Sequence, residues 1–229
     1  MGGIGTMPKG ETRNSKPLNL KAVDASMVLL TGPSGSGKST LAKSLERRGW
    51  QRLDGDALAK SLYVPGSPLL RAIAKEFGET ILKSDASLDT QRLGEIVFPS
   101  VKKRAALKRL VYKPFLRALR SGLRAARLKA RPCVAEVAVY FDLGAPRLNL
   151  PVVLVQAPVG TRVARLRAAG LSAKLASARA RALRFGARER RRCDLVLDGR
   201  KALPALLRDF DGGLKALGRG REATVKGRR

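Results

Sequence analysis

The stretch that decides the fold reads Gly32-Pro33-Ser34-Gly35-Ser36-Gly37-Lys38-Ser39 and matches the phosphate-loop pattern G-x-x-x-x-G-K-[ST] in full. The apolar run Met27–Thr31 precedes it directly, and a helix-forming stretch from Ser39 to Arg48 follows. Glycines let backbone N–H groups turn around a phosphate, and a helix N-terminus adds the positive end of its dipole. The context therefore predicts a nucleoside triphosphate site.

Within this loop, each part has an expected contact. Lys38 is expected to reach the β- and γ-phosphates, and the Ser39 hydroxyl is expected to bind Mg²⁺. We expect ATP to lie on the whole loop from Gly32 to Thr40. The loop pattern does not by itself distinguish kinases from GTPases or motor ATPases. No N-K-x-D guanine-reading motif is found, and the chain is short for a motor ATPase, so a small-molecule kinase is favoured.

Outside the loop, apolar runs alternate with helical patterns, which predicts an α/β domain with a parallel sheet. Besides Met27–Thr31, the expected strands are Trp50–Leu53, Cys133–Val139, Val152–Gln156 and Asp194–Asp198. Val101–Arg131 carries 12 basic residues and no acidic one, and it predicts one amphipathic helix or two that meet near Pro114. Residues 1–26 and 211–229 are expected to be a flexible tail and a basic tail without folded structure.

Composition limits the classes of function. The 229 residues are 44% hydrophobic, which is enough for a packed core and excludes a wholly disordered chain. No apolar stretch is long enough to span a membrane. The chain has no histidine, which excludes imidazole acid–base chemistry and the usual zinc sites. Cys133 and Cys193 match no metal motif and are expected to be core thiols.

The net charge of +29 predicts attraction to polyanions such as nucleotides, phosphorylated metabolites or RNA. A codon bias of the genome toward arginine is an alternative explanation of this net charge. Aromatic residues make up only 4%, which leaves few rings for bases to stack on, so nucleic acid is an open but less favoured partner. The missing signal segment and the unpaired cysteines favour the cytoplasm, and we expect a monomer.

A second motif, Asp54-Gly55-Asp56, ends the second expected strand. Because the carboxyl ends of parallel strands meet at one sheet edge, both carboxylates can face the phosphate loop. Transfer of a phosphoryl group to a hydroxyl requires an oriented acceptor oxygen and a group that takes up its proton, and Asp56 is the candidate. The simpler alternative is an acidic turn that caps the following helix.

At this point the chain resembles the dephospho-CoA kinase family over roughly residues 28–199. The similar elements, in order, are the phosphate loop, Leu53–Ala59, Val64–Pro68, Phe77-Gly78, Leu88–Phe98, Lys113-Pro114, Glu136–Asp142 and Asp194–Asp198. The resemblance implies transfer of the γ-phosphate of ATP to the 3′-hydroxyl of dephospho-CoA. It implies a P-loop kinase core over 27–210, a five-stranded parallel sheet flanked by helices, an acceptor-binding helical region at about 58–130 and a lid at about 160–190.

The resemblance also implies roles for individual residues. It makes Asp56 the base, Arg165 a catalytic lid arginine and Arg179 a nucleotide-binding residue. The chain departs from the family at Lys113, Ala138, Asp142, Ala169, Leu183, Glu189 and Gly199. At Ala169 the family has an arginine, for which Arg162 and Arg167 are the available substitutes. Loss of a transition-state arginine can cost a factor of 10³ or more. Three alternatives therefore stay open: a kinase of another small metabolite, a nucleotide-dependent nucleic-acid-binding protein, and a catalytically degenerate relative.

Overall fold

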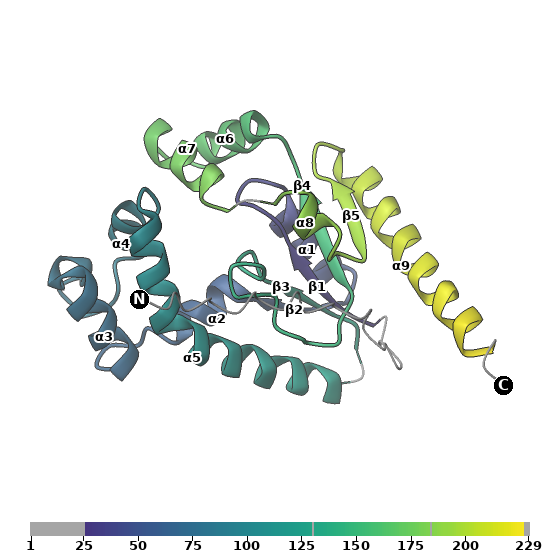
Figure 1. Ribbon diagram of the computed structural model, residues 1–229, viewed down its shortest axis with the longest axis horizontal. Coiled ribbons are helices and arrows are strands. Elements are labelled where there is room, and N and C mark those ends of the chain that lie inside the picture. The colour runs from purple at the N-terminus through teal and green to yellow at the C-terminus, as the bar shows by residue number, and fades with distance from the viewer. Residues whose placement is uncertain (1–25, 130, 184, 227–229) are drawn as a thin grey trace, which may run out of the picture.

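The computed structural model describes residues 26–129, 131–183 and 185–226 (Figure 1). Its centre is a five-stranded sheet in the order β2-β3-β1-β4-β5, in which every pairing is parallel. The strands are β1 (Met27–Thr31), β2 (Gln51–Asp54), β3 (Cys133–Glu136), β4 (Val152–Gln156) and β5 (Leu195–Asp198). The expected five-stranded parallel sheet is therefore confirmed, and the expected N-terminal tail lies almost entirely outside the described residues.

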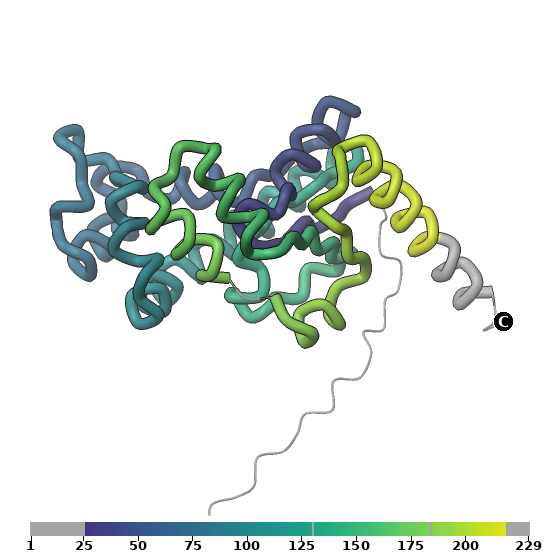
Figure 2. Tube along the Cα trace, turned by 90° about the horizontal axis from the view of Figure 1, so that it is seen from above, coloured from purple at the N-terminus to yellow at the C-terminus, as the bar shows by residue number. Residues whose placement is uncertain are grey.

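Helices cover both faces of this sheet (Figures 1 and 2). Their bounds are α1 Lys38–Arg47, α2 Gly55–Ser61, α3 Pro68–Phe77, the short 3₁₀ helix η1 Glu79–Ile81, α4 Thr90–Val97, α5 Val101–Leu128, α6 Val159–Ala168, α7 Ala173–Ala182, α8 Ala187–Arg190 and α9 Leu203–Lys226. Within the described residues, none of these helices combines the length and apolar character needed to cross a membrane.

The strand β1 lies in the middle and is buried along its whole length. Because side chains alternate along a strand, Met27 and Leu29 point into one core, and Val28 and Leu30 into the other. The first core is filled by the C-terminal half of α5, and the second by α1 and α9. Burial on both faces fixes the position of the loop that follows β1.

A third, smaller core lies in the helical region between β2 and β3. There, α3, η1 and α4 pack on the N-terminal half of α5. Serine and aspartate side chains cap these helices: Ser67 caps α3, Asp89 caps α4 and Ser100 caps α5. The residues between β2 and β3 thus form a helical insertion with a core of its own, and its expected role in binding the acceptor stays a prediction.

Helix α5 runs continuously through Pro114, so the alternative of two helices was wrong. A proline removes one backbone hydrogen bond from a helix interior. The buried side chains that follow it, Phe115, Leu116 and Leu119, keep this part of the helix on the first core. Packing against the sheet therefore carries the helix past the proline.

The expectation for the C-terminus was also wrong, because α9 extends to Lys226 and no unfolded tail begins at residue 211. The helix packs closely on the edge strand here, because a Cβ at Gly213 would lie 2.5 Å from the Leu195 side chain of β5. The glycine lets the helix approach the edge strand closely, and Leu214 continues the packing on the second core.

Candidate active site

The phosphate loop connects β1 to α1 and is held tightly between neighbouring elements. Gly32 has φ +146°, and a Cβ there would overlap the Val155 carbonyl oxygen of β4. Gly35 has φ +77°, and a Cβ there would lie 2.7 Å from the Arg162 carbonyl oxygen of α6. Both positions require glycine for conformation and for space. The loop is therefore fixed by the sheet on one side and by α6, in the segment expected to be the lid, on the other.

Two polar side chains of this loop, Ser36 and Lys38, are buried. The hydroxyl of Ser36 is buried and has no hydrogen-bond partner in the structure. Lys38 is only 8% exposed, and burial lowers its pKa, while the charges of Glu136 and Asp56 act to raise it. A buried hydroxyl and a buried ammonium at a helix N-terminus suit an anion. The geometry fits the phosphates of a nucleotide.

Glu136 is a site residue that the sequence reasoning did not select. It ends β3, is 6% exposed and accepts a hydrogen bond from the Ser39 hydroxyl. The guanidinium of Arg52 donates to the same carboxylate at 2.7 Å and 3.3 Å. A signal was available, because Glu136 ends the strand that pairs directly with β1, in register with Leu30. Ser39 and Glu136 together offer the hard oxygen ligands that Mg²⁺ prefers.

The two aspartates of the D-G-D motif have different surroundings. Asp54 accepts hydrogen bonds from the backbone N–H groups of Asp56 and Ala57 at 2.9 and 3.1 Å, so it caps α2. It also forms an ion pair with Arg52 at 2.5 Å. The capping interpretation is thus correct for Asp54. Asp56 lies in the first turn of α2. Its carboxylate accepts no hydrogen bond from the residues that the structure describes, and its charge acts on Lys38.

Tyr63 belongs to the surroundings of Asp56. Burial raises the pKa of Tyr63 to about 12, and the charge of Asp56 adds to this shift. The tyrosine follows α2 and packs against the third core. It therefore links the expected base to the helical insertion, and its hydroxyl stays protonated at neutral pH.

The lid arginines are engaged differently from one another. Arg162 is buried, and its guanidinium donates to the carbonyl oxygens of Ala157 and Ala180, so it ties α6 to α7. That arrangement makes it a structural residue of the lid. Arg165 donates to the carbonyl oxygens of Gly35 at 3.3 Å and Gly199 at 2.8 Å. It bridges the phosphate loop and the loop after β5.

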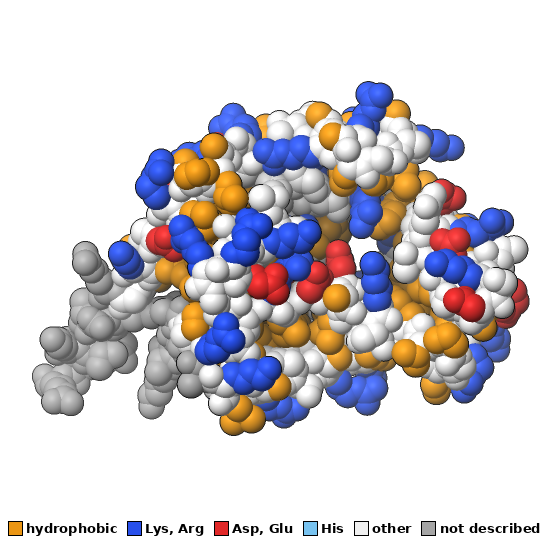
Figure 3. Space-filling model, turned by 180° about the vertical axis from the view of Figure 1, so that it is seen from behind, with side chains coloured by type: hydrophobic (Ala, Val, Ile, Leu, Met, Phe, Trp, Pro, Cys, Tyr) orange, Lys and Arg blue, Asp and Glu red, His pale blue; other side chains and the backbone are white. Residues whose placement is uncertain are grey.

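Arg179, on α7, affects the phosphate site through its charge. Its charge lowers the pKa of Lys38, which means that the two cations lie in the same electrostatic neighbourhood. Its Nε atom is buried and has no hydrogen-bond partner, and its guanidinium lies over the ring of Phe98. The space-filling view from behind shows an opening near the centre of that face, bordered by acidic and basic side chains (Figure 3).

Two departures from the family pattern have local explanations. A Cβ at Gly199 would overlap the carbonyl oxygen of Ser36, so the close contact between this loop and the phosphate loop leaves no room for asparagine. Glu189 accepts a hydrogen bond from the Gly186 N–H at 2.9 Å, which lowers the pKa of its carboxyl group. It thus caps the short helix α8, a role that explains an acidic residue among arginines.

Comparison with known proteins identifies the family. The family model for dephospho-CoA kinase matches residues 26–204, which include β1, the insertion, the lid and β5. The chain belongs to the dephospho-CoA kinase family. The dephospho-CoA kinase of Symbiobacterium thermophilum is 35% identical over 179 residues, covering 77% of this chain and 75% of that protein. The enzyme of Thermobifida fusca is 36% identical, covering 75% and 86%.

Solved structures support the fold of this family member. The Thermus thermophilus protein TT1252 superposes with a TM-score of 0.62 at 31% identity, covering 85% of this chain and 96% of that one. The dephospho-CoA kinase of Campylobacter jejuni gives a TM-score of 0.59 at 17% identity, covering 86% and 98%. A Sinorhizobium meliloti gluconokinase, at 0.50 and 19%, shares the fold. The expected P-loop kinase fold is confirmed.

Proposed function

We propose that this protein transfers the γ-phosphoryl group of ATP to the 3′-hydroxyl of dephospho-CoA. The observation that carries the proposal is the buried Lys38 of a complete phosphate loop, which shares its electrostatic environment with the Asp56 carboxylate. Membership in the dephospho-CoA kinase family supports the identity of the acceptor. Both reactants carry several phosphate groups, which suits the strongly basic chain.

The nucleotide would lie on the loop from Gly32 to Thr40, at the N-terminus of α1. The Ser36 hydroxyl, which lacks a protein partner, would donate to a phosphate oxygen. Ser39 and Glu136 would hold Mg²⁺, directly or through its water ligands. When bound, this ion would neutralise charge on the β- and γ-phosphates. The Ser39 hydroxyl donates a hydrogen bond to the Glu136 carboxylate, so the two groups are adjacent at the site.

The remaining roles follow from position and charge. Asp56 orients the acceptor hydroxyl and accepts its proton, since its carboxylate is free of the capping contacts that occupy Asp54. Lys38 and Arg179 stabilise charge on the transferring group. Arg165 holds the loop after β5 against the phosphate loop, which shapes the wall of the nucleotide site.

The test measures ADP release from ATP and Mg²⁺ with dephospho-CoA, with mass determination of the product. Controls contain adenosine, phosphopantetheine or no acceptor. We expect ADP only with dephospho-CoA, and a product heavier by one phosphate. ADP release that does not depend on the acceptor, or preferential phosphorylation of another acceptor, would contradict the proposal.

A matched pair of variants tests the assignment of the base. Asp56→Asn should lower the turnover rate by about 10² to 10⁴, the usual contribution of a general base. Asp54→Asn should stay within about threefold of the parent, because asparagine caps helices as well as aspartate does. An equal loss in both variants would show that the motif acts through structure and that Asp56 is not the base.

A further inference from the structure

Helix α7 of the lid meets the helical insertion at an aromatic side chain. Phe98 directly follows α4, two residues before the cap of α5, and the guanidinium carbon of Arg179 lies 5.3 Å from its ring centroid. Within the described residues, no hydrogen bond or ion pair joins α7 to residues 58–129. Figure 1 shows α7 above α4 on the same side of the molecule. The cation–π contact joins these two regions.

Arg179 is the lid residue with unused donor capacity at the phosphate site. Its Nε–H is buried and lacks an acceptor, a costly state that an arriving phosphate oxygen would relieve. Its positive charge already lowers the pKa of Lys38. An aromatic face can hold a guanidinium in place without consuming any of its N–H donors. The contact with Phe98 thus leaves the forked donors available for a phosphoryl group.

Phe98 is held in place by one contact to its backbone and one to its ring. The Arg104 guanidinium donates a hydrogen bond to the Phe98 carbonyl oxygen, which anchors the backbone at the start of α5. The ring lies against Gly94 of α4, where a Cβ would be 3.1 Å from its Cε2 atom. These contacts come entirely from the helical insertion. The position of the ring, and through it the position of Arg179, therefore follows the region expected to bind the acceptor.

We propose that Phe98 is a positioning residue that holds Arg179 at the transferring phosphoryl group and so couples the acceptor-binding region to the lid. This inference rests on the proposed function, because it assigns Arg179 to the phosphoryl group. Phe98 lies outside the phosphate loop and outside α6 and α7, yet the rate of phosphoryl transfer depends on it. The larger effect is expected in kcat, since the arginine is needed where charge is redistributed in the transition state, and a smaller effect is expected in ATP affinity, since the same guanidinium faces the phosphates of the bound nucleotide.

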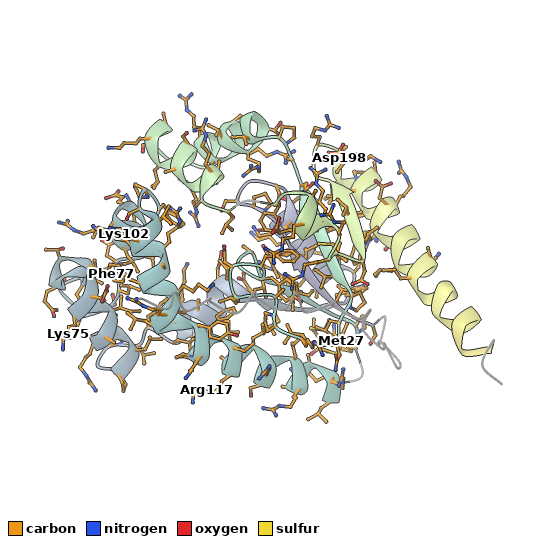
Figure 4. All side chains as sticks on the ribbon, viewed as in Figure 1. Met27, Lys75, Phe77, Lys102, Arg117 and Asp198 are labelled. Carbon is orange, nitrogen blue, oxygen red and sulfur yellow. The ribbon has the colours of Figure 1, made fainter. Side chains whose placement is uncertain are left out.

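The experiment measures kcat and the KM values for ATP and dephospho-CoA in Phe98→Leu, Phe98→Tyr and the matched control Phe77→Leu. Phe77 is an aromatic residue of the same insertion, packed on the third core, and no recorded cation–π contact involves it (Figure 4). We expect Phe98→Leu to lower kcat by about 2- to 30-fold, the range of a cation–π contact. Phe98→Tyr should restore it, and Phe77→Leu should leave it unchanged.

A double-mutant cycle separates positioning from a purely structural effect. If Phe98 acts through Arg179, Phe98→Leu should have no further effect on kcat in the Arg179→Ala background. An equal loss in both backgrounds, an equal loss in Phe77→Leu, or no loss in Phe98→Leu would each overturn the proposal. Thermal unfolding of each variant identifies any that fail to fold, and Phe98→Tyr then carries the comparison.

A separate measurement distinguishes failure of the proposed function from failure of the inference about Phe98. Turnover of dephospho-CoA by the unmodified chain is measured first, and its absence would contradict the proposed function alone. The same cycle is then run on the dissociation constant for ATP, measured by calorimetry without acceptor. We expect Arg179→Ala to weaken ATP binding and Phe98→Leu to have no further effect in that background. Independent effects on ATP affinity would overturn the inference about Phe98.

Discussion

The ion pair of Arg52 with Glu136 provides the sharpest test of how the site is stabilised. The side chain of Arg52 is only 14% exposed. It forms ion pairs with the side chains of Glu136 and Asp54, which are 7% and 31% exposed. We consider the substitution Arg52→Met, which keeps most of the volume and removes the charge. It leaves a buried carboxylate at the end of β3 without its main cationic partner.

The magnitude follows from this burial. Removal of one partner of a fully buried pair costs about 3–5 kcal/mol, because the other charge stays buried and unpaired. Here the Ser39 hydroxyl and the nearby Lys38 ammonium still stabilise Glu136. We therefore expect Arg52→Met to lose about 2–4 kcal/mol of unfolding free energy. For a chain of this size that corresponds to a decrease of about 4–16 °C in Tm.

The assay is urea unfolding followed by circular dichroism, together with a thermal scan, in the absence of nucleotide. The double variant Arg52→Met/Glu136→Gln should recover at least half of the loss, because the unpaired charge is gone. Asp54→Asn serves as the control for the weaker, more exposed partner. A loss below about 0.5 kcal/mol in Arg52→Met, or a double variant no more stable than the sum of the single losses, would refute the reasoning.

Three further predictions follow from local geometry. Gly32→Ala should prevent folding or lower Tm by more than 10 °C, since the new Cβ would overlap a carbonyl oxygen of β4; an unchanged melting curve would contradict this. Burial raises the pKa of Cys133 to about 11 and that of Cys193 to about 12, so Ellman's reagent at pH 8 should label both thiols only after unfolding, and rapid labelling of the folded protein would refute it. Hydrogen bonds from Arg200 lower the pKa of Asp198 to about 2, so the stability difference between the parent and Asp198→Asn should be constant above about pH 4 and vanish as the pH falls to about 2; a difference that grows on acidification would contradict this sign.

Features that depend on residues close together in the sequence could be predicted from the sequence alone. The loop from Gly32 to Ser39 carries its own strand, turn and helix signals, and every strand of the sheet except β2 is a short, mainly apolar run. The site residues that were missed depend on contacts distant in sequence. Arg52 and Ser39 meet Glu136 from 84 and 97 residues away, and no spacing rule indicates that meeting.

The lid and the C-terminus show two other limits. The resemblance gave the positions of Arg165 and Arg179 but not the directions of their side chains, which depend on carbonyl oxygens and on the ring of Phe98. The stretch after residue 211 was expected to be an unfolded basic tail, whereas α9 continues through it and the small size of Gly213 allows close packing against β5. A glycine in a helical pattern can signal close approach as well as a break.

Helix α5 has a mechanical consequence for catalysis. One end of this helix forms the platform on which α3 and α4 pack, and its other end is embedded beneath the central sheet. One continuous helix thus contributes to two hydrophobic cores. Densely packed cores have low compressibility, so a displacement of one end of the helix is transmitted to the other. This shared helix should keep the insertion fixed relative to the sheet. We therefore expect any opening and closing around the two substrates to occur in α6 and α7, with the insertion as the stationary side.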